Sequence, residues 1–189
     1  MEYFVMCCDG VYPSAAIAKG PDLGNDAPWV FGKPLRKIPE GPLIYTLDPQ
    51  RTGNICAMYD AISHPIMRDD LVEALTAAGA TNLELFEAHI LDPVTAIRHT
   101  NYKAFNVLGW VSAADMNRSQ LAEGSTSTLI DVEFDRLSID PDRAKASGLH
   151  LFRLAESVTT IIVDERVKNE VEGRKIPGMD FYEPADWSG

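Results

Sequence analysis

The sequence predicts an α+β fold: a single domain over residues 1–189 with a mostly antiparallel or mixed sheet and two or three amphipathic helices. Segments with strand-like patterning outnumber those with helical spacing, and they come in runs rather than in regular strand–helix alternation. A chain of 189 residues also fits one hydrophobic core, because chains divide into separate cores only at larger sizes.

The predicted strands are short apolar or alternating segments that end at turn residues. They cover residues 3–8, 43–47, 82–91, 102–111, 129–139, 149–154, 160–163 and 179–182. Residues 54–59 fit either a short strand or a loop. Trp110 lies inside the 102–111 segment, and we expect its large aromatic side chain in the core.

The segment 129–139 shows the clearest alternation. Three apolar residues alternate with three acidic ones, in the order Ile130, Asp131, Val132, Glu133, Phe134 and Asp135. Because successive strand residues point to opposite faces, this pattern predicts a half-buried strand with one solvated, acidic face.

Two of the predicted helices have clear end signals. Pro65 suits the first turn of the earlier helix, apolar residues follow it at helical spacing, and Gly79 ends it. Asp164 caps the later helix, and Gly173 provides a left-handed stop. In both places a strand follows the glycine. Such units recur widely in proteins, so we interpret the similarity as coincidence rather than as duplication.

Residues 19–42 are rich in proline, glycine and other turn residues and predict a long surface loop. Trp29 belongs to the apolar part of this loop, which must pack against the domain. Alternatively, its side chain anchors a partner, because tryptophan is enriched at binding hot spots. The same two alternatives apply to Trp187 near the C-terminus.

The formal net charge of −11 disfavours binding to nucleic acid or to an anionic membrane, since both require a basic surface. It favours a basic protein partner, because complementary charge raises association rates. No apolar stretch reaches the ~20 residues of a membrane-spanning helix, and the N-terminal residues lack the basic segment of a secretory signal. We therefore expect a cytoplasmic protein.

We find no catalytic or cofactor motif and expect no enzymatic activity, cofactor or metal. Cys7, Cys8 and Cys56 lack the spacing of a metal or redox site, and we expect free thiols. His89 and His99 flank Asp92, but no third ligand lies at a recognisable spacing, so we interpret both as surface or hydrogen-bonded histidines.

The three carboxylates of the acidic strand do not form a magnesium-nuclease motif. That motif needs a lysine two residues after an acidic residue, where this chain has Asp135 and Leu137 instead. Two interpretations remain open: a face that is simply solvated, or a docking face for a basic partner.

Three segments resemble one known family of proteins. They are the opening YFVMCCDGVYP (3–13), the middle segment NYKAFNVLGWVSAADMNRS (101–119) and the C-terminal LHLFRLAESVTTIIVDERVKNEVEGRKIPGMDFYEP (149–184). Each combines packing residues with turns, and in the last an LFRL strand precedes a helix and a glycine-then-phenylalanine strand. Together they are similar to immunity family eleven, an α+β family of bacterial polymorphic toxin systems.

The resemblance implies a cytoplasmic protein that binds and inactivates a cognate toxin domain, often a nuclease, without catalysis. Asp131, Glu133, Asp135 and Trp29 are then the candidate toxin-contact residues. Two other functions remain as alternatives: an enzyme with an unrecognised active site, and a structural or scaffold subunit.

Overall fold

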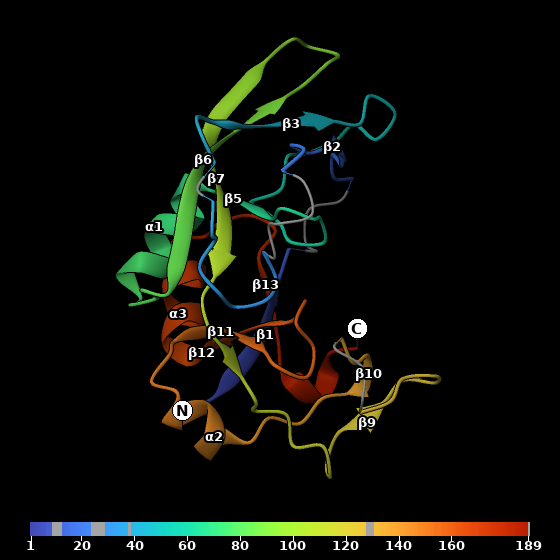
Figure 1. Cartoon of the computed structure of the whole chain (residues 1–189), viewed down its shortest axis with the longest axis vertical. Coiled ribbons are helices and arrows are strands. Elements are labelled where there is room, and N and C mark those ends of the chain that lie inside the picture. The colour runs from blue at the N-terminus through green and yellow to red at the C-terminus, as the bar shows by residue number, and fades with distance from the viewer. Residues whose placement is uncertain (9–12, 24–28, 38, 128–130, 189) are drawn as a thin grey trace.

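A computed structural model describes residues 1–8, 13–23, 29–37, 39–127 and 131–188 (Figure 1). These residues form a six-stranded sheet, a five-stranded sheet and a two-stranded sheet, together with three α-helices and one short 3-10 helix. The sheets contain both antiparallel and parallel pairs. The α+β class with mixed sheets and three helices is therefore confirmed.

The six-stranded sheet has the order β2-β3-β6-β7-β5-β4. Its strands are β2 (Ile17–Lys19), β3 (Leu43–Leu47), β4 (Met58–Tyr59), β5 (Ile66–Arg68), β6 (Leu83–Leu91) and β7 (Arg98–Val107). β6 and β7 form a long antiparallel hairpin whose tip projects at the top of Figure 1. No helix or strand occurs between β2 and β3 among the residues that the structure describes, as expected for the long loop.

The five-stranded sheet has the order β13-β1-β12-β11-β8. Its strands are β1 (Tyr3–Cys7), β8 (Trp110–Val111), β11 (Leu151–Leu154), β12 (Ile161–Asp164) and β13 (Asp180–Tyr182). A separate two-stranded sheet joins β9 (Gln120–Leu121) to β10 (Phe134–Arg136). The N-terminal strand thus lies between two C-terminal strands.

Three clusters of buried side chains hold these layers together. The first lies between the two large sheets and α1 (Asp69–Ala77) and α3 (Glu165–Gly173), which pack side by side (Figure 1). The second joins the other face of the five-stranded sheet to residues 111–144, including α2 (Pro141–Ala146). The third joins the six-stranded sheet to the loops before β3 and β5.

Two parts of the fold share one topology. β4, β5, α1 and β6 follow one another in the chain, and β7 lies between β5 and β6. β11, β12, α3 and β13 do the same, and β1 lies between β12 and β13. All corresponding strand pairs are antiparallel. The similarity seen in the sequence therefore extends to strand order and direction, although the central strand comes from the opposite end of the chain.

The earlier helix begins later than its sequence pattern predicts. Residues Ile66–Arg68 form β5 and pair with β7, and the helix starts only at Asp69. Ile66 and Met67 are fully buried on opposite sides of the strand, in the third and the first core respectively. Their apolar character fits both a helix and a strand, and the neighbouring β7 decides between them.

The later helix ends differently from the prediction. Gly173 lies in the last turn of α3, and its φ is not in the left-handed region. The left-handed residue is Lys175 (φ 56), which corresponds to Gly79 (φ 94), since each follows its nine-residue helix after one intervening residue. The next residue, Ile176, then packs into the first core, so the position of the turn is set by that contact.

The predicted cap of this helix is confirmed. The Asp164 carboxylate accepts hydrogen bonds from the backbone amides of Arg166 (3.1 Å) and Val167 (3.2 Å). It also contacts the His150 ring, with 2.7 Å between Oδ2 and Nδ1. Asp164 is completely buried, so these three contacts replace its contacts with water.

Two glycine substitutions test the observed helix ends. Gly173→Ala should raise the free energy of unfolding by about 0.5–1 kcal/mol, because a helical glycine with open space around it costs backbone entropy. Gly79→Ala should lower it by about 1–2 kcal/mol, since alanine is strained at positive φ and its Cβ would lie 3.1 Å from the His150 ring. Urea unfolding of both variants measures the difference; a loss of stability in Gly173→Ala would support the left-handed stop at Gly173.

Removal of the Asp164 carboxylate should destabilise the protein. We expect Asp164→Ala to lose about 2 kcal/mol of unfolding free energy, at the upper end for a helix cap, because the contact of this buried carboxylate with His150 is lost as well. Asp164→Asn keeps a side-chain oxygen for the two amides and should lose less. Chemical denaturation compares the variants, and equal stability of Asp164→Ala and the parent would contradict the capping role.

Candidate docking surface

The predicted alternation of the acidic segment is present in its described part. Val132 and Phe134 are buried in the second core, whereas Asp131, Glu133 and Asp135 are exposed. Ile130 lies outside the described residues. Residues 131–139 do not form one continuous strand: β10 covers only Phe134–Arg136, and the preceding residues bond to the turn after β11 instead.

Asp131 has a structural role within the fold. Its carboxylate accepts hydrogen bonds from the Thr159 amide (3.2 Å), the Thr159 hydroxyl (3.0 Å) and the Ser157 hydroxyl (3.4 Å). Thr159 and Ser157 belong to the turn between β11 and β12. The carboxylate therefore fixes this turn against the acidic segment, even though the residue is exposed.

The same turn encloses a buried arginine. Arg153 donates from Nη1 to the carbonyl oxygens of Val158 (2.9 Å) and Thr159 (3.2 Å), and its side chain is fully buried. Burial lowers the pKa of Arg153 to about 10, while the charges of Asp60 and Asp131 oppose this shift. Asp131 thus also compensates a positive charge inside the domain.

Glu133 and Asp135 are arranged differently. Neither carboxylate forms a hydrogen bond or ion pair with another residue that the structure describes. Their backbone is nevertheless held in place, because Phe134 between them is buried and β10 pairs with β9. These two residues present fixed positions for negative charge that no other residue in the described ranges neutralises.

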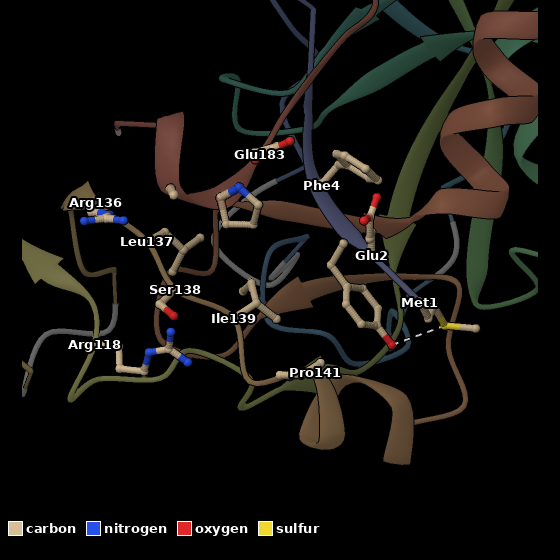
Figure 2. Close-up of a pocket in the computed structure, with 13 residues that line it drawn as sticks. Met1, Glu2, Phe4, Arg118, Arg136, Leu137, Ser138, Ile139, Pro141 and Glu183 are labelled. Carbon is tan, nitrogen blue, oxygen red and sulfur yellow. Dashed lines mark hydrogen bonds between the residues drawn. The ribbon is translucent and has the colours of Figure 1, made fainter.

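A groove of about 610 Å³ lies beside the acidic segment (Figure 2). The segment from Arg136 to Ile139 lines it, together with N-terminal residues and the 3-10 helix η1 (Pro184–Asp186). Arg118 and Arg136 lie at one end of the groove, and Glu2 lies at the other. Within the described chain, neither guanidinium forms an ion pair. The acidic residues and the groove thus follow one another along a single segment, and we call residues 131–139 with this groove the docking surface.

Trp29 does not contribute to this surface. Its side chain is only 1% exposed and packs edge-on against the rings of His64 (5.6 Å between centroids) and Phe86 (5.3 Å). The tryptophan therefore anchors the long loop onto the six-stranded sheet. The predicted contact between Trp29 and a partner would require the long loop to move away from the sheet.

Trp110, expected in the core, is 39% exposed and contradicts that prediction. Its ring lies 5.9 Å from the ring of Phe31, and its indole nitrogen donates to the Val30 carbonyl oxygen (2.9 Å). Gly109 separates β7 from β8, so Trp110 belongs to a short strand at the edge of the other sheet. This glycine is the sequence signal that could have indicated the break.

His89 and Asp92 each have a partner close to them in the chain. His89 is buried and lies 3.1 Å from a Glu87 carboxylate oxygen. Asp92 accepts from the Val94 and Thr95 amides and the Thr95 hydroxyl, and these donors lower its pKa. No group of three or more histidine, cysteine or acidic residues suited to a metal ion occurs in the described part of the chain.

Comparison with known proteins identifies the family. The model of the immunity protein family Imm11 matches residues 15–186, which is nearly the whole chain. The chain belongs to this family. No curated protein matches the sequence. Membership in Imm11 supports a role in immunity to a toxin and implies a cognate toxin as the partner. Among the described helices, none has the length and apolar character needed to cross a membrane.

Two substitutions distinguish the structural role of Asp131 from the exposed position of Asp135. Asp131→Ala should lower the free energy of unfolding by about 1–3 kcal/mol. The substitution removes three hydrogen bonds and also removes a negative charge that compensates the buried positive charge of Arg153. Asp135→Ala should change it by less than about 0.5 kcal/mol, as for an exposed residue without partners. Thermal or urea unfolding tests both. Equal changes in unfolding free energy for the two substitutions would contradict a structural role that is specific to Asp131.

Proposed function

We propose that this Imm11 protein binds a basic, nuclease-like toxin domain and neutralises it by covering its active surface, without turnover. The observation that carries the proposal is the pair of exposed carboxylates of Glu133 and Asp135, which have no partner among the described residues and lie on a segment with a buried apolar face. Charges on a backbone that is already fixed complement a basic partner with little loss of conformational entropy on binding.

The overall charge supports the same partner chemistry. The chain carries a net charge of −11, which disfavours direct contact with nucleic acid or an anionic membrane. Toxin domains that cleave nucleic acid need basic clefts to hold phosphates. An acidic immunity protein can therefore occupy the surface that the substrate would use, in the cytoplasm of the cell that it protects.

The groove adds specificity to this electrostatic attraction. Arg136 directly follows Asp135, and Arg118 lines the same end of the groove, so a uniformly basic surface would be repelled at this end. A cognate toxin would satisfy both regions by presenting basic groups to Glu133 and Asp135 and an acidic or polar group to the groove. Opposed charges next to each other discriminate between related partners in this way.

A charge reversal tests the docking surface. We expect Glu133→Lys/Asp135→Lys to slow association with the cognate toxin at least tenfold at low salt, because exposed charges act mainly on the association rate. The difference should shrink at high salt, where screening acts within ~3–10 Å. Stopped-flow or surface-plasmon kinetics at several salt concentrations measure both effects.

The matched control is Glu40→Lys/Glu172→Lys, which changes the net charge equally at two exposed acidic residues elsewhere. Its association rate should fall much less. Equal slowing by both double variants would indicate a general charge effect without a docking surface at Glu133 and Asp135. Absence of any toxin binding by the parent protein would contradict the proposed function itself.

A further inference from the structure

Hydrogen bonds fix part of the long loop, residues 30–37, beside the β6–β7 hairpin (Figure 1). The Gly109 amide donates to the Gly32 carbonyl oxygen (2.7 Å), and the Asn106 side chain donates to the Lys33 carbonyl oxygen (2.8 Å). These bonds hold the loop backbone in one position. Binding of a partner to this segment therefore requires little further ordering of the loop.

Two further residues hold the same segment. Leu35 is buried in the third core, and its amide donates to Oε2 of Glu84 (3.0 Å). The same carboxylate oxygen accepts a hydrogen bond from the buried Asn106 side chain (2.8 Å). The Glu84 carboxylate therefore supports the loop backbone, and it forms no ion pair with any residue in the described ranges.

Two exposed aromatic rings meet at this segment. The ring of Phe31, which is 40% exposed, lies 5.9 Å from the ring of Trp110 between centroids. The Trp110 indole nitrogen donates to the Val30 carbonyl oxygen (2.9 Å), and a Cβ at Gly32 would lie only 2.8 Å from the Trp110 ring. The glycine therefore permits the close approach of the loop to the indole. The two rings form an apolar area of the kind that is enriched at protein interfaces.

Basic residues follow Phe31 in the sequence, namely Lys33, Arg36 and Lys37. All three are exposed. Their side chains form no hydrogen bond or ion pair with another residue that the structure describes. The segment is therefore locally basic, on a chain whose net charge is −11. Its positive charge is available to a partner of the opposite sign.

We propose that this part of the loop binds a short acidic segment of a partner protein. The site, which we call the aromatic–basic patch, consists of Phe31, Lys33, Arg36, Lys37 and Trp110. Carboxylates of the bound segment pair with the three basic side chains, and one of its aromatic or aliphatic side chains packs on the two exposed rings. The patch shares no residue with the docking surface and carries the opposite charge. It is a second interaction site, and its test does not depend on the proposed toxin.

The charges of the molecule select among the possible occupants of the patch. The basic toxin domain proposed above would be repelled by the three basic side chains. A nucleic acid could stack on the rings, but its phosphates continue along the strand beyond this small area, over a chain of net charge −11. A second copy of this chain offers the carboxylates of Glu133 and Asp135, but Phe134 between them is buried. A short acidic segment with its own exposed apolar side chain satisfies both parts of the patch.

The test uses the full chain and a fluorescein-labelled synthetic peptide in which glutamates flank a central phenylalanine–leucine pair. Three probes of equal length provide the comparison: a peptide of glutamates alone, the apolar peptide with lysines in place of the glutamates, and a single-stranded oligonucleotide. Fluorescence anisotropy should show saturable binding of the acidic apolar peptide, with a dissociation constant below about 1 mM at low salt. Binding should weaken at high salt, and the other probes should bind at least about fivefold more weakly.

Charge reversal tests the location of the site. Lys33→Glu/Lys37→Glu should weaken binding of the acidic apolar peptide at least about tenfold, because it replaces two positive charges with two negative ones. The matched control Lys145→Glu/Lys175→Glu changes the net charge equally at exposed lysines outside the patch. It should weaken binding by less than about threefold, because charges farther from the peptide are screened. Circular dichroism checks that each variant is folded.

Truncation of one ring tests the apolar contact. Phe31→Ala should weaken binding of the same peptide by about fivefold, since it removes part of the surface on which the apolar side chain packs. Val94→Ala, at an exposed apolar residue between β6 and β7, is the control and should leave binding unchanged.

The proposal is overturned if the parent protein shows no saturable binding of the acidic apolar peptide, or if both charge variants weaken binding equally. Tighter binding of the oligonucleotide would assign the patch to nucleic acid and would also overturn it. So would self-association of the parent protein in analytical ultracentrifugation that Phe31→Ala abolishes, because the occupant would then be a second copy. The measurements with the parent protein and the four probes decide the question even where a variant does not fold.

Discussion

The architecture depends on the position of the N-terminal strand β1 between β12 and β13. Phe4 and Met6 point from this strand into the core shared by the two large sheets, while Tyr3 and Val5 point into the core on the opposite face. One strand thus supplies side chains to two cores, and its backbone provides the pairing partner of β13. Without β1, apolar side chains in the cores on both faces of the five-stranded sheet would be exposed. The backbone groups of β12 and β13 that pair with β1 would also be unpaired.

The same strand also helps to form the docking surface. Residues before β1 line the groove of the docking surface. A second constraint acts on the acidic segment. The Asp131 carboxylate accepts hydrogen bonds from the turn after β11 and compensates the positive charge of Arg153. Asp131, whose carboxylate stabilises the fold, therefore lies within a few residues of Glu133 and Asp135, whose carboxylates are available to a partner.

Local sequence patterns predicted much of this fold. The alternation around Val132 and Phe134 indicated which side chains would be buried, and Asp164 followed by an amphipathic segment indicated a capped helix; both features are present. Asp140 followed by Pro141 carries the corresponding signal for α2, a helix that we did not predict. These features depend on neighbours in the chain, so their physical causes can be recognised without knowledge of the fold.

Contacts between distant segments decided the rest. Ile66 and Met67 belong to a strand because β7 lies beside them, and Trp29 is buried because the long loop folds over the six-stranded sheet. Composition and spacing alone determined the fold class, the acidic character and most of the strands. Which acidic residue is structural depends on packing across the domain, because a residue's sequence neighbours do not specify what lies across from it in space.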